Sequence, residues 1–540
     1  MNSATRARLL VTGGLSLLCF APSARAQPAP ENSARFAAAD VHPSPSVITP
    51  VFDSSFRPNG LYHLHNATLV DLIRTAWDIE TEAVAGGPPW LDTERFEISA
   101  KAPPQSTQVE RAAMLRGLLA ERFKLAVHAG EKELEVYALT VSPGGAHLQQ
   151  SGAQGSTTCK PDFNPSPRAL ITVTCPSITI GEFAKYIRRF SGGGYIRRPV
   201  SDLTGLKGAY AITIRWSPNG APKTNDAGEP IFTSIVDAVD KQLGLKLDLT
   251  RRAFPVIVID HVERTPTPND PEALKLIPAP ETEFEAATIK VNKSGDDDQR
   301  IEPKPGGRLE IINFPLKDLI EFAWHYEDDD RIIGLPGWAE KERYDIIGKT
   351  AVLPDERRPA FDDMRLMVRA LLIERFHIKA RDDQQPIGVW ALTVSKRGAK
   401  LKDAADPSGR STCTRSPSQT GSGSAALPAM SYICTNTTMA QLAQALQNIG
   451  GGYVDKPAVD MTGLQGKYDF TLTWNPRSVI SSGGRGGKPD PSDSGASDPS
   501  GGITFVAALE KQLGLHLEGG QKYRMPVLAI DHVEPLGPDQ

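Results

Sequence analysis

The amino-acid sequence contains two copies of one long pattern, and this duplication constrains the fold more than any other feature. The segment GGGYIRRPVSDLTGLKGAYAITIRW (192–216) returns as GGGYVDKPAVDMTGLQGKYDFTLTW (450–474). The pentapeptide IDHVE (259–263) returns unchanged at 530–534. Shared apolar residues, glycines and prolines at matching positions indicate that both copies fold in the same way. The chain should therefore be built from two homologous repeats.

The two repeats are expected to span residues 35–265 and 282–536 of the 540-residue chain. Between them, residues 266–281 are rich in proline, which is typical of a semi-rigid linker. A chain of this length is long enough for several domains that each bury a core.

Within each repeat, the hydrophobic periodicity alternates between helix and strand. TLVDLIRTAW (68–77) and MLRGLLAERF (114–123) have apolar residues at helical spacing, whereas RFEISAKA (95–102) alternates as a strand does. After a cysteine-containing segment the same order begins again. We predict an α+β fold in which each repeat contains two α-β-β-α-β-β units with small mixed or antiparallel sheets.

Particular strands can also be predicted. KLAVHAGE (124–131) and VYALTVS (136–142) are expected to be two separate strands. The segments PVSDLT (199–204) and YAITIRW (210–216) are expected to pair as a hairpin through the turn DLTGLKG. Asp202 and Thr204 can hydrogen-bond backbone amides in such a turn.

Residues 1–26 have the pattern of a cleaved signal peptide. Arg6 and Arg8 precede a short apolar run, and Ala24 and Ala26 supply the small residues that signal peptidase prefers. We expect cleavage after Ala26 and export to the periplasm or the exterior.

Composition excludes several classes of function. The formal net charge is −4, so no overall basic field would attract nucleic acid. No stretch after the signal peptide reaches the roughly 18–20 apolar residues that span a bilayer, so the mature chain should lack a transmembrane segment. We find no phosphate-binding loop, no dinucleotide fingerprint and no nucleophile motif.

Four cysteines follow the signal peptide, two in each repeat. In an oxidising compartment we expect the disulfides Cys159–Cys175 and Cys413–Cys434. Neither pair has the C-x-x-C spacing of a zinc or redox site.

The duplicated IDHVE motif is the strongest candidate for chemistry. On a strand, His261 and Glu263 share one face, as do His532 and Glu534, while Asp260 points to the opposite face. Two side chains are too few for a zinc site, so we expect no metal and no cofactor. We interpret the motif as the polar end of a buried strand, with an acid–base or metal role as the alternative.

Two further features are candidates for binding. Trp90 and Trp338 follow matching Gly-x-Pro loops, where an indole could contact a ligand or fix the loop to the sheet; we favour the second interpretation. The basic cluster 188–198 occurs only in the first repeat. We expect it to be a solvated face, with an anion-binding patch as the alternative.

The segments RFEISAKA, LLAERFKLAVH, VYALTVS, DLTGLKGAYAI, QLGLKL and VIDHVE resemble a large secreted family of unknown function known from Solibacter-type acidobacteria. The resemblance covers nearly the whole mature chain, in tandem. It implies no activity, because none is established for that family. The helix–strand–strand order of each half-repeat is also similar to the short N-terminal domains of secretins and TonB-dependent receptors, which are docking modules.

These observations predict an exported, non-enzymatic protein that binds or docks in the bacterial cell envelope. Its partner would be an envelope protein or polymer. The alternatives are a secreted hydrolase that uses the Asp-His-x-Glu motifs and a ligand-sensing domain.

Overall fold

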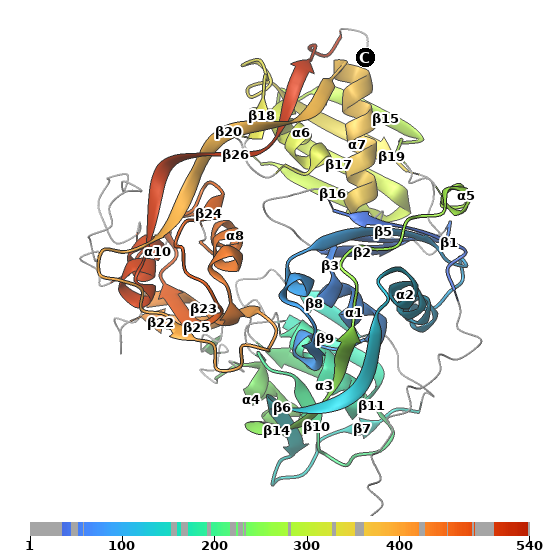
Figure 1. The fold of residues 1–540 in the computed structure, drawn as a ribbon. Helices are drawn as coiled ribbons and strands as arrows, with labels where there is room; N and C mark the ends of the chain where they lie inside the picture. Colours follow the sequence, from blue (N-terminus) through green and yellow to red (C-terminus); the bar gives the residue numbers. More distant parts are fainter. Residues whose placement is uncertain are drawn as a thin grey trace, which may run out of the picture. The chain divides into compact units, whose positions relative to one another are not determined.

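The computed structural model describes most of the chain between residues 35 and 537 (Figure 1). Within that range the description omits the short stretches 45–51, 58, 153–158, 164–170, 192–195, 217–222, 225–229, 232–233, 279–281, 297, 327–330, 351–360, 421–426, 451, 478–479 and 481–501. The expected signal peptide, 1–26, lies outside the described residues.

The first repeat begins with a four-stranded antiparallel sheet and two helices. In spatial order its strands are β1 (Ala38–Pro43), β5 (Arg95–Lys101), β3 (Leu61–Thr68) and β2 (Asp53–Phe56). Helices α1 (Leu69–Trp77) and α2 (Gln108–Arg122) share one apolar core with this sheet. Between α1 and β5 lie η1 (Thr81–Ala83), β4 (Val84–Gly86) and η2 (Pro89–Asp92).

The second half of this repeat also contains a four-stranded sheet and two helices. Its sheet contains, in order, β7 (Gln149–Gln150), β11 (Ala209–Trp216), β9 (Ile171–Thr179) and β8 (Lys160–Phe163). Its helices are α3 (Ile180–Phe190) and α4 (Ile235–Leu243), and they share a second apolar core with the sheet. The other short strands are β10 (Val200–Asp202), β12 (Lys223–Thr224) and β13 (Pro230–Ile231).

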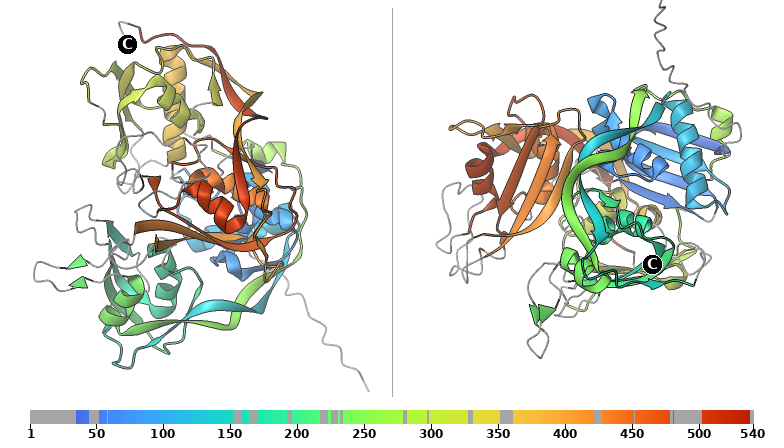
Figure 2. Two further views of the ribbon diagram at one scale, coloured as in Figure 1. Left: turned by 90° about the vertical axis from the view of Figure 1, so that its left-hand side faces the viewer. Right: turned by 90° about the horizontal axis from the view of Figure 1, so that it is seen from below.

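A long antiparallel ribbon joins the two halves. It consists of β6 (Ala126–Val141) and β14 (Leu245–His261), which pair along almost their whole length (Figures 1 and 2). Ile259, near one end, packs in the first core, and Leu139 and Leu245, at the other end, pack in the second. Each half of the repeat is therefore built onto one end of the same ribbon.

The halves also exchange short strands across this ribbon. β4, from the first half, pairs in parallel with β14, the last strand of the second half. β10, from the second half, pairs in parallel with β6, the last strand of the first half. Each half contains the succession β-α-β-β-α-β, from β3 to β6 and, apart from β12 and β13, from β9 to β14. Each strand of the ribbon also pairs with a short strand of the other half.

The second repeat reproduces this arrangement. Its first sheet contains β15 (Ala286–Val291), β19 (Arg343–Lys349), β17 (Arg308–Pro315) and β16 (Arg300–Lys304), and its second contains β21 (Lys402–Asp403), β25 (Tyr468–Trp474), β23 (Leu427–Thr437) and β22 (Thr412–Thr420). The ribbon is formed by β20 (Lys379–Val394) and β26 (Leu515–His532), with the exchanged strands β18 (Ile332–Ile333) and β24 (Ala458–Asp460). The helical elements are α6 (Leu316–Trp324), α7 (Phe361–Phe376), α8 (Met439–Ile449), α10 (Phe505–Ala508), the π-helical turn η7 (Leu509–Leu513) and the short η3 (Pro305–Gly307).

The predicted α+β fold with tandem repeats and small sheets is confirmed, but two predicted strand arrangements are wrong. Residues 126–131 and 136–141 of the two segments belong to the single strand β6, because the polar residues between them lie on a ribbon that has no core to enter there. The segments 199–204 and 210–216 do not pair with each other. β10 pairs with β6, whereas β11 pairs with β9 and β7.

The expected linker also contacts the first repeat. Arg122, at the end of α2, is buried, and its Nε donates to the carbonyl oxygen of Thr267 at 3.0 Å. The amide of Val41 in β1 donates to Asn269 Oδ1 at 3.0 Å. Further along, residues Pro271–Leu274 form the short helix α5.

Threonine side chains begin several of the helices. Thr68 Oγ1 accepts from the amide of Asp71 at 3.1 Å, and Asp71 Oδ2 accepts from the amide of Thr68 at 3.0 Å. This reciprocal capping box satisfies amides that an α-helix cannot pair internally. The same arrangement begins α2, α3 and α8 at Thr107, Thr179 and Thr438.

Just before the helix, three of the four β-α-β-β-α-β units contain an asparagine with positive φ. Its amide donates to a carboxylate on the neighbouring strand, at a point where the strand register shifts. The pairs are Asn66 with Glu97 Oε1 at 3.0 Å, Asn313 with Asp345 Oδ1 at 2.9 Å, and Asn436 with Asp469 Oδ1 at 2.9 Å. Each carboxylate therefore holds the backbone bend that directs the chain from strand into helix.

The predicted disulfides Cys159–Cys175 and Cys413–Cys434 are present, one in each repeat. In the second repeat the bonded cysteines face each other on β22 and β23. Among the described residues, no helix is both long and apolar enough to cross a membrane.

Replacing Asp345 by alanine should destabilise the protein by about 1–3 kcal/mol, because the amide of Asn313 and the Asn292 side chain lose their acceptor. Calorimetric melting measures the effect. Glu340→Ala is the matched control, because Glu340 is exposed and its ion pair with Lys317 is long, at 3.8 Å. Equal melting temperatures for the two variants would show that the carboxylate does not hold the bend.

Candidate functional site

The IDHVE motif lies at the polar end of each ribbon, as expected. The strand contains a bulge at Asp260 and at Asp531, and both aspartates are half-exposed. Asp260 accepts from His128 Nδ1 at 2.8 Å, whereas Asp531 pairs with Arg381 at 3.3 Å. His128 and Arg381 occupy matching positions, so the aspartate has a basic partner on the neighbouring strand in both repeats. That partner is a histidine only in the first repeat.

The histidine and glutamate of each motif are exposed. His532 Nε2 lies 2.8 Å from Glu534 Oε1, which places these two side chains on the same side. His261 and Glu263 are exposed at the matching position. The amides of Glu263 and Glu534, the last residues of the motifs, donate to the carbonyl oxygens of Phe123 and Phe376 at the ends of α2 and α7.

The tryptophan loops lie against the IDHVE strands. Trp90 and Trp338 are half-buried, and each packs against the core of its own half-repeat. In both loops a glycine with positive φ, Gly86 or Gly334, lies against the backbone of the motif isoleucine. The structure therefore places the tryptophan loops and the IDHVE motifs, both predicted from sequence as candidate sites, in neighbouring elements.

The basic cluster of the first repeat is largely paired. Arg188 is mostly buried and contacts Glu80 at 3.2 Å and Glu82 at 2.8 Å. Arg198 pairs with Glu135 at 3.0 Å. The expectation of a solvated face is therefore wrong for Arg188, because its guanidinium joins α3 to η1 of the other half.

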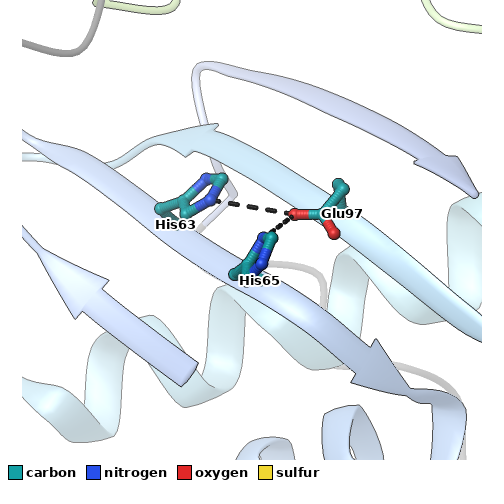
Figure 3. Close-up of side chains that lie close together, drawn as sticks. All are labelled: His63, His65 and Glu97. Carbon is teal, nitrogen blue, oxygen red and sulfur yellow. Dashed lines mark hydrogen bonds and ion pairs between the residues drawn. The ribbon is translucent and has the colours of Figure 1, made fainter. Parts of the chain in front are cut away.

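Sequence reasoning missed a cluster of two histidines and a glutamate in the first sheet (Figure 3). His63 and His65 are two residues apart on β3, and Glu97 extends toward them from β5. Glu97 Oε2 lies 2.7 Å from His65 Nδ1 and 3.8 Å from His63 Nε2. Alternation along β3 puts the histidines on the face opposite Leu64, which packs in the helix-covered core.

The cluster is held by further hydrogen bonds. Ser99, directly across from His63 in the strand register, lies 3.0 Å from its Nδ1. Glu97 Oε1 accepts from the Ser44 hydroxyl at 2.6 Å and from the Asn66 amide at 3.0 Å. The two oxygens of Glu97 thus have separate partners: Oε1 holds the backbone, and Oε2 faces the histidines.

The surroundings keep the glutamate ionised. Burial raises the pKa of Glu97, but hydrogen bonds from His65, Ser44 and the Asn66 amide outweigh it and hold the pKa below its usual value. The Glu97 side chain is 7% exposed, whereas His63 and His65 are 22% and 26% exposed. Because both histidines are partly exposed, a small ion has access to the cluster.

The second repeat has the same carboxylate position without the histidines. Asp345 matches Glu97, while Glu310 and Ile312 match His63 and His65. Glu310 is occupied by an ion pair with Arg308 at 2.8 Å. The histidine pair is therefore a specific feature of the first repeat.

The sequence did contain a signal for this cluster. YHLHN alternates as a strand does and places two histidines on one face, and RFEIS was already recognised as a strand. His63 and His65 have no histidine counterparts in the second repeat, so residues shared by the two repeats give no sign of this cluster.

Comparison with known families agrees with the duplication. A family model described as "Protein of unknown function (DUF3738)" matches residues 70–262 and again residues 317–533. The two matches cover most of the chain, so the protein belongs to this family, as a tandem copy. No curated protein matches the chain, and no solved structure does.

Trp338→Ala should destabilise the protein by about 2–4 kcal/mol, somewhat less than the loss of a fully buried aromatic side chain. The reason is its packing against the core of the second repeat. Thermal melting tests this, with Trp338→Phe as the control that keeps most of the contact. An unchanged melting temperature for Trp338→Ala would show that the indole does not fix the loop.

Proposed function

We propose that the protein is a non-enzymatic binding protein that docks onto an envelope protein through the same turn in each repeat. The turn is DLTGL in the first repeat and DMTGL in the second. It presents Leu203 and Met461, which are 42% and 43% exposed. A matched pair of exposed apolar side chains on rigid turns is the observation that carries the proposal.

The turn is rigid because its side chains bond its own backbone. Asp202 Oδ1 accepts from the amide and the hydroxyl of Thr204, at 3.0 and 2.7 Å. Thr204 Oγ1 accepts from the amide of Leu206 at 3.2 Å. The amide of Leu203 donates to Leu139 in β6 at 2.9 Å, which attaches the turn to the ribbon.

The second repeat forms the same bonds. Asp460 Oδ1 accepts from the amide and hydroxyl of Thr462 at 2.9 and 2.8 Å, and the amide of Met461 donates to Leu392 at 2.9 Å. A single exposed apolar residue is ordinary on a protein surface. The same exposure at matching positions, with the same hydrogen bonds, favours a shared role in contact with a partner.

The polar residues common to both repeats also support binding over catalysis. Asp202 and Asp460 are used in turns, and Asp71 is used in a helix cap. Asp260 and Asp531 are used in cross-strand pairs whose basic partner differs between repeats. A hydrolase that used the Asp-His-x-Glu motif of both repeats would need the same catalytic side chains in both, and the partner of the aspartate differs between them.

Two contact points on one chain suit a partner that carries apolar pockets and is present in several copies. Joining two weak sites raises the overall affinity through effective concentration, without any new contact. We therefore expect an envelope protein rather than a polymer as the partner.

Export belongs to the same proposal. The signal-peptide pattern of residues 1–26 and the disulfide in each repeat support a periplasmic or secreted location. A kinship with the acidobacterial secreted family and with the docking domains of secretins and TonB-dependent receptors would agree with an envelope role.

Affinity capture tests the proposal. The mature protein, immobilised, is exposed to a solubilised envelope extract, and the retained proteins are identified. Leu203→Ser and Met461→Ser should each weaken retention of a partner, and the double variant should lose it by at least about tenfold, because both contacts are removed.

Val109→Ser is the matched control, because Val109 is 75% exposed but has no part in the turns. It should retain the partner as the wild type does. Retention that survives the double substitution, or that Val109→Ser abolishes equally, would contradict docking through the turns. Melting curves confirm that each variant is folded.

A further inference from the structure

We propose that His63 Nε2, His65 Nδ1 and Glu97 Oε2 form a binding site for one divalent transition-metal ion of the zinc type. This inference is independent of the docking proposal and replaces our expectation of a chain without metal. The three ligand atoms lie within 4.8 Å of one another. The cluster joins neighbouring strands of one sheet, so its geometry depends on a single half-repeat.

The donor set fits zinc. Two imidazole nitrogens and one carboxylate oxygen are a common set of three protein ligands for Zn²⁺, with a fourth position left for water or another ligand. Imidazole donors favour late first-row ions over Mg²⁺ or Ca²⁺, which prefer oxygen alone. The cluster therefore selects for Zn²⁺ or a chemically similar ion.

The distances require only small side-chain movements. Two ligand atoms about 2.0–2.1 Å from a tetrahedral ion are separated by roughly 3.3 Å. His65 Nδ1 and Glu97 Oε2, now hydrogen-bonded at 2.7 Å, would separate slightly. His63 Nε2, now 3.8 Å from Glu97 Oε2, would approach by a similar amount.

The surrounding hydrogen bonds already orient two ligands for such an ion. Ser99 contacts His63 Nδ1, which leaves Nε2 on the side of Glu97. Ser44 and the Asn66 amide both bind Glu97 Oε1, which leaves Oε2 for the ion. Partners of this kind set ring orientation and ligand basicity in known metal sites.

The second repeat separates the structural role of the carboxylate from its proposed role as a ligand. Asp345 binds the amide of Asn313 as Glu97 binds that of Asn66, yet Asp345 has one methylene group fewer. The shorter side chain is therefore sufficient to hold the bend. The extra length of Glu97 brings its second oxygen to the histidines.

This comparison suggests a substitution that tests metal binding without disturbing the fold. Glu97→Asp should preserve the fold, as the second repeat shows that aspartate supports the same bend. The shorter side chain should no longer reach the ion, and Zn²⁺ binding should weaken by more than about 100-fold, beyond the 10- to 100-fold typical of losing a residue that only supports a ligand. His65→Ile, which installs the residue of the second repeat, should have the same effect.

The experiment is an isothermal titration of the metal-free mature protein with Zn²⁺, with Co²⁺ absorption as a second readout. Wild type should bind one ion, and its Co²⁺ complex should show the intense visible bands of a low-coordinate site. Ser99→Ala should lower the affinity by about 10- to 100-fold while leaving one site.

His128→Asn is the control for adventitious binding, because His128 belongs to the separate pair with Asp260. It should bind Zn²⁺ as the wild type does. The proposal is overturned if wild type binds no ion, if folded Glu97→Asp and His65→Ile bind it unchanged, or if His128→Asn removes the binding.

Discussion

The antiparallel pairing of β6 with β14, repeated by β20 with β26, is the interaction on which the rest of the structure depends. A two-stranded ribbon is only marginally stable by itself in water. Here each end of the ribbon enters an apolar core, through Ile259 at one end and Leu245 at the other. The halves of a repeat are therefore connected by hydrogen-bonded backbone as well as by chain connectivity.

The exchange of short strands strengthens this dependence. β4 and β10 each complete the sheet edge formed by the last strand of the other half. A half-repeat in isolation would expose that edge, and exposed edges promote aggregation. The family model accordingly matches both halves of each repeat together, from α1 to the end of β14 and from α6 to the end of β26.

Comparison of the two repeats also distinguishes residues that support the fold, which are present in both, from residues that are present in only one. The carboxylate that binds a positive-φ asparagine is present in both repeats, as Glu97 and Asp345. The two histidines beside Glu97 are absent from the second repeat, so the fold does not require them. A site that is not needed for folding in a duplicated scaffold is a reasonable place for a specific function.

Much of the fold could be predicted from sequence, because helices such as 114–123 have strong apolar periodicity and the copies can be compared directly. The continuity of β6 could not, because its polar centre lies outside any core and resembles a loop. The partner of β10 was missed because parallel pairing with a distant strand leaves no local signal.

The candidate sites divide in the same way. The turn of Asp202 and Thr204 was predictable from local hydrogen bonding, and both disulfides from cysteine spacing and compartment. The cluster of His63, His65 and Glu97 depends on which two strands are neighbours. Comparing the repeats for shared residues favours scaffold positions and hides a site present only once.

A crystal soaked with Zn²⁺ and measured at the zinc absorption edge tests the central claim most directly. The account predicts an anomalous peak about 2 Å from His63 Nε2, His65 Nδ1 and Glu97 Oε2, and no peak beside Asp345, which has the carboxylate but lacks the histidines. The account holds that the carboxylate supports the backbone in both repeats and that only the first repeat binds a metal ion. Absence of a peak at the histidines, or equal peaks at Glu97 and Asp345, would contradict it.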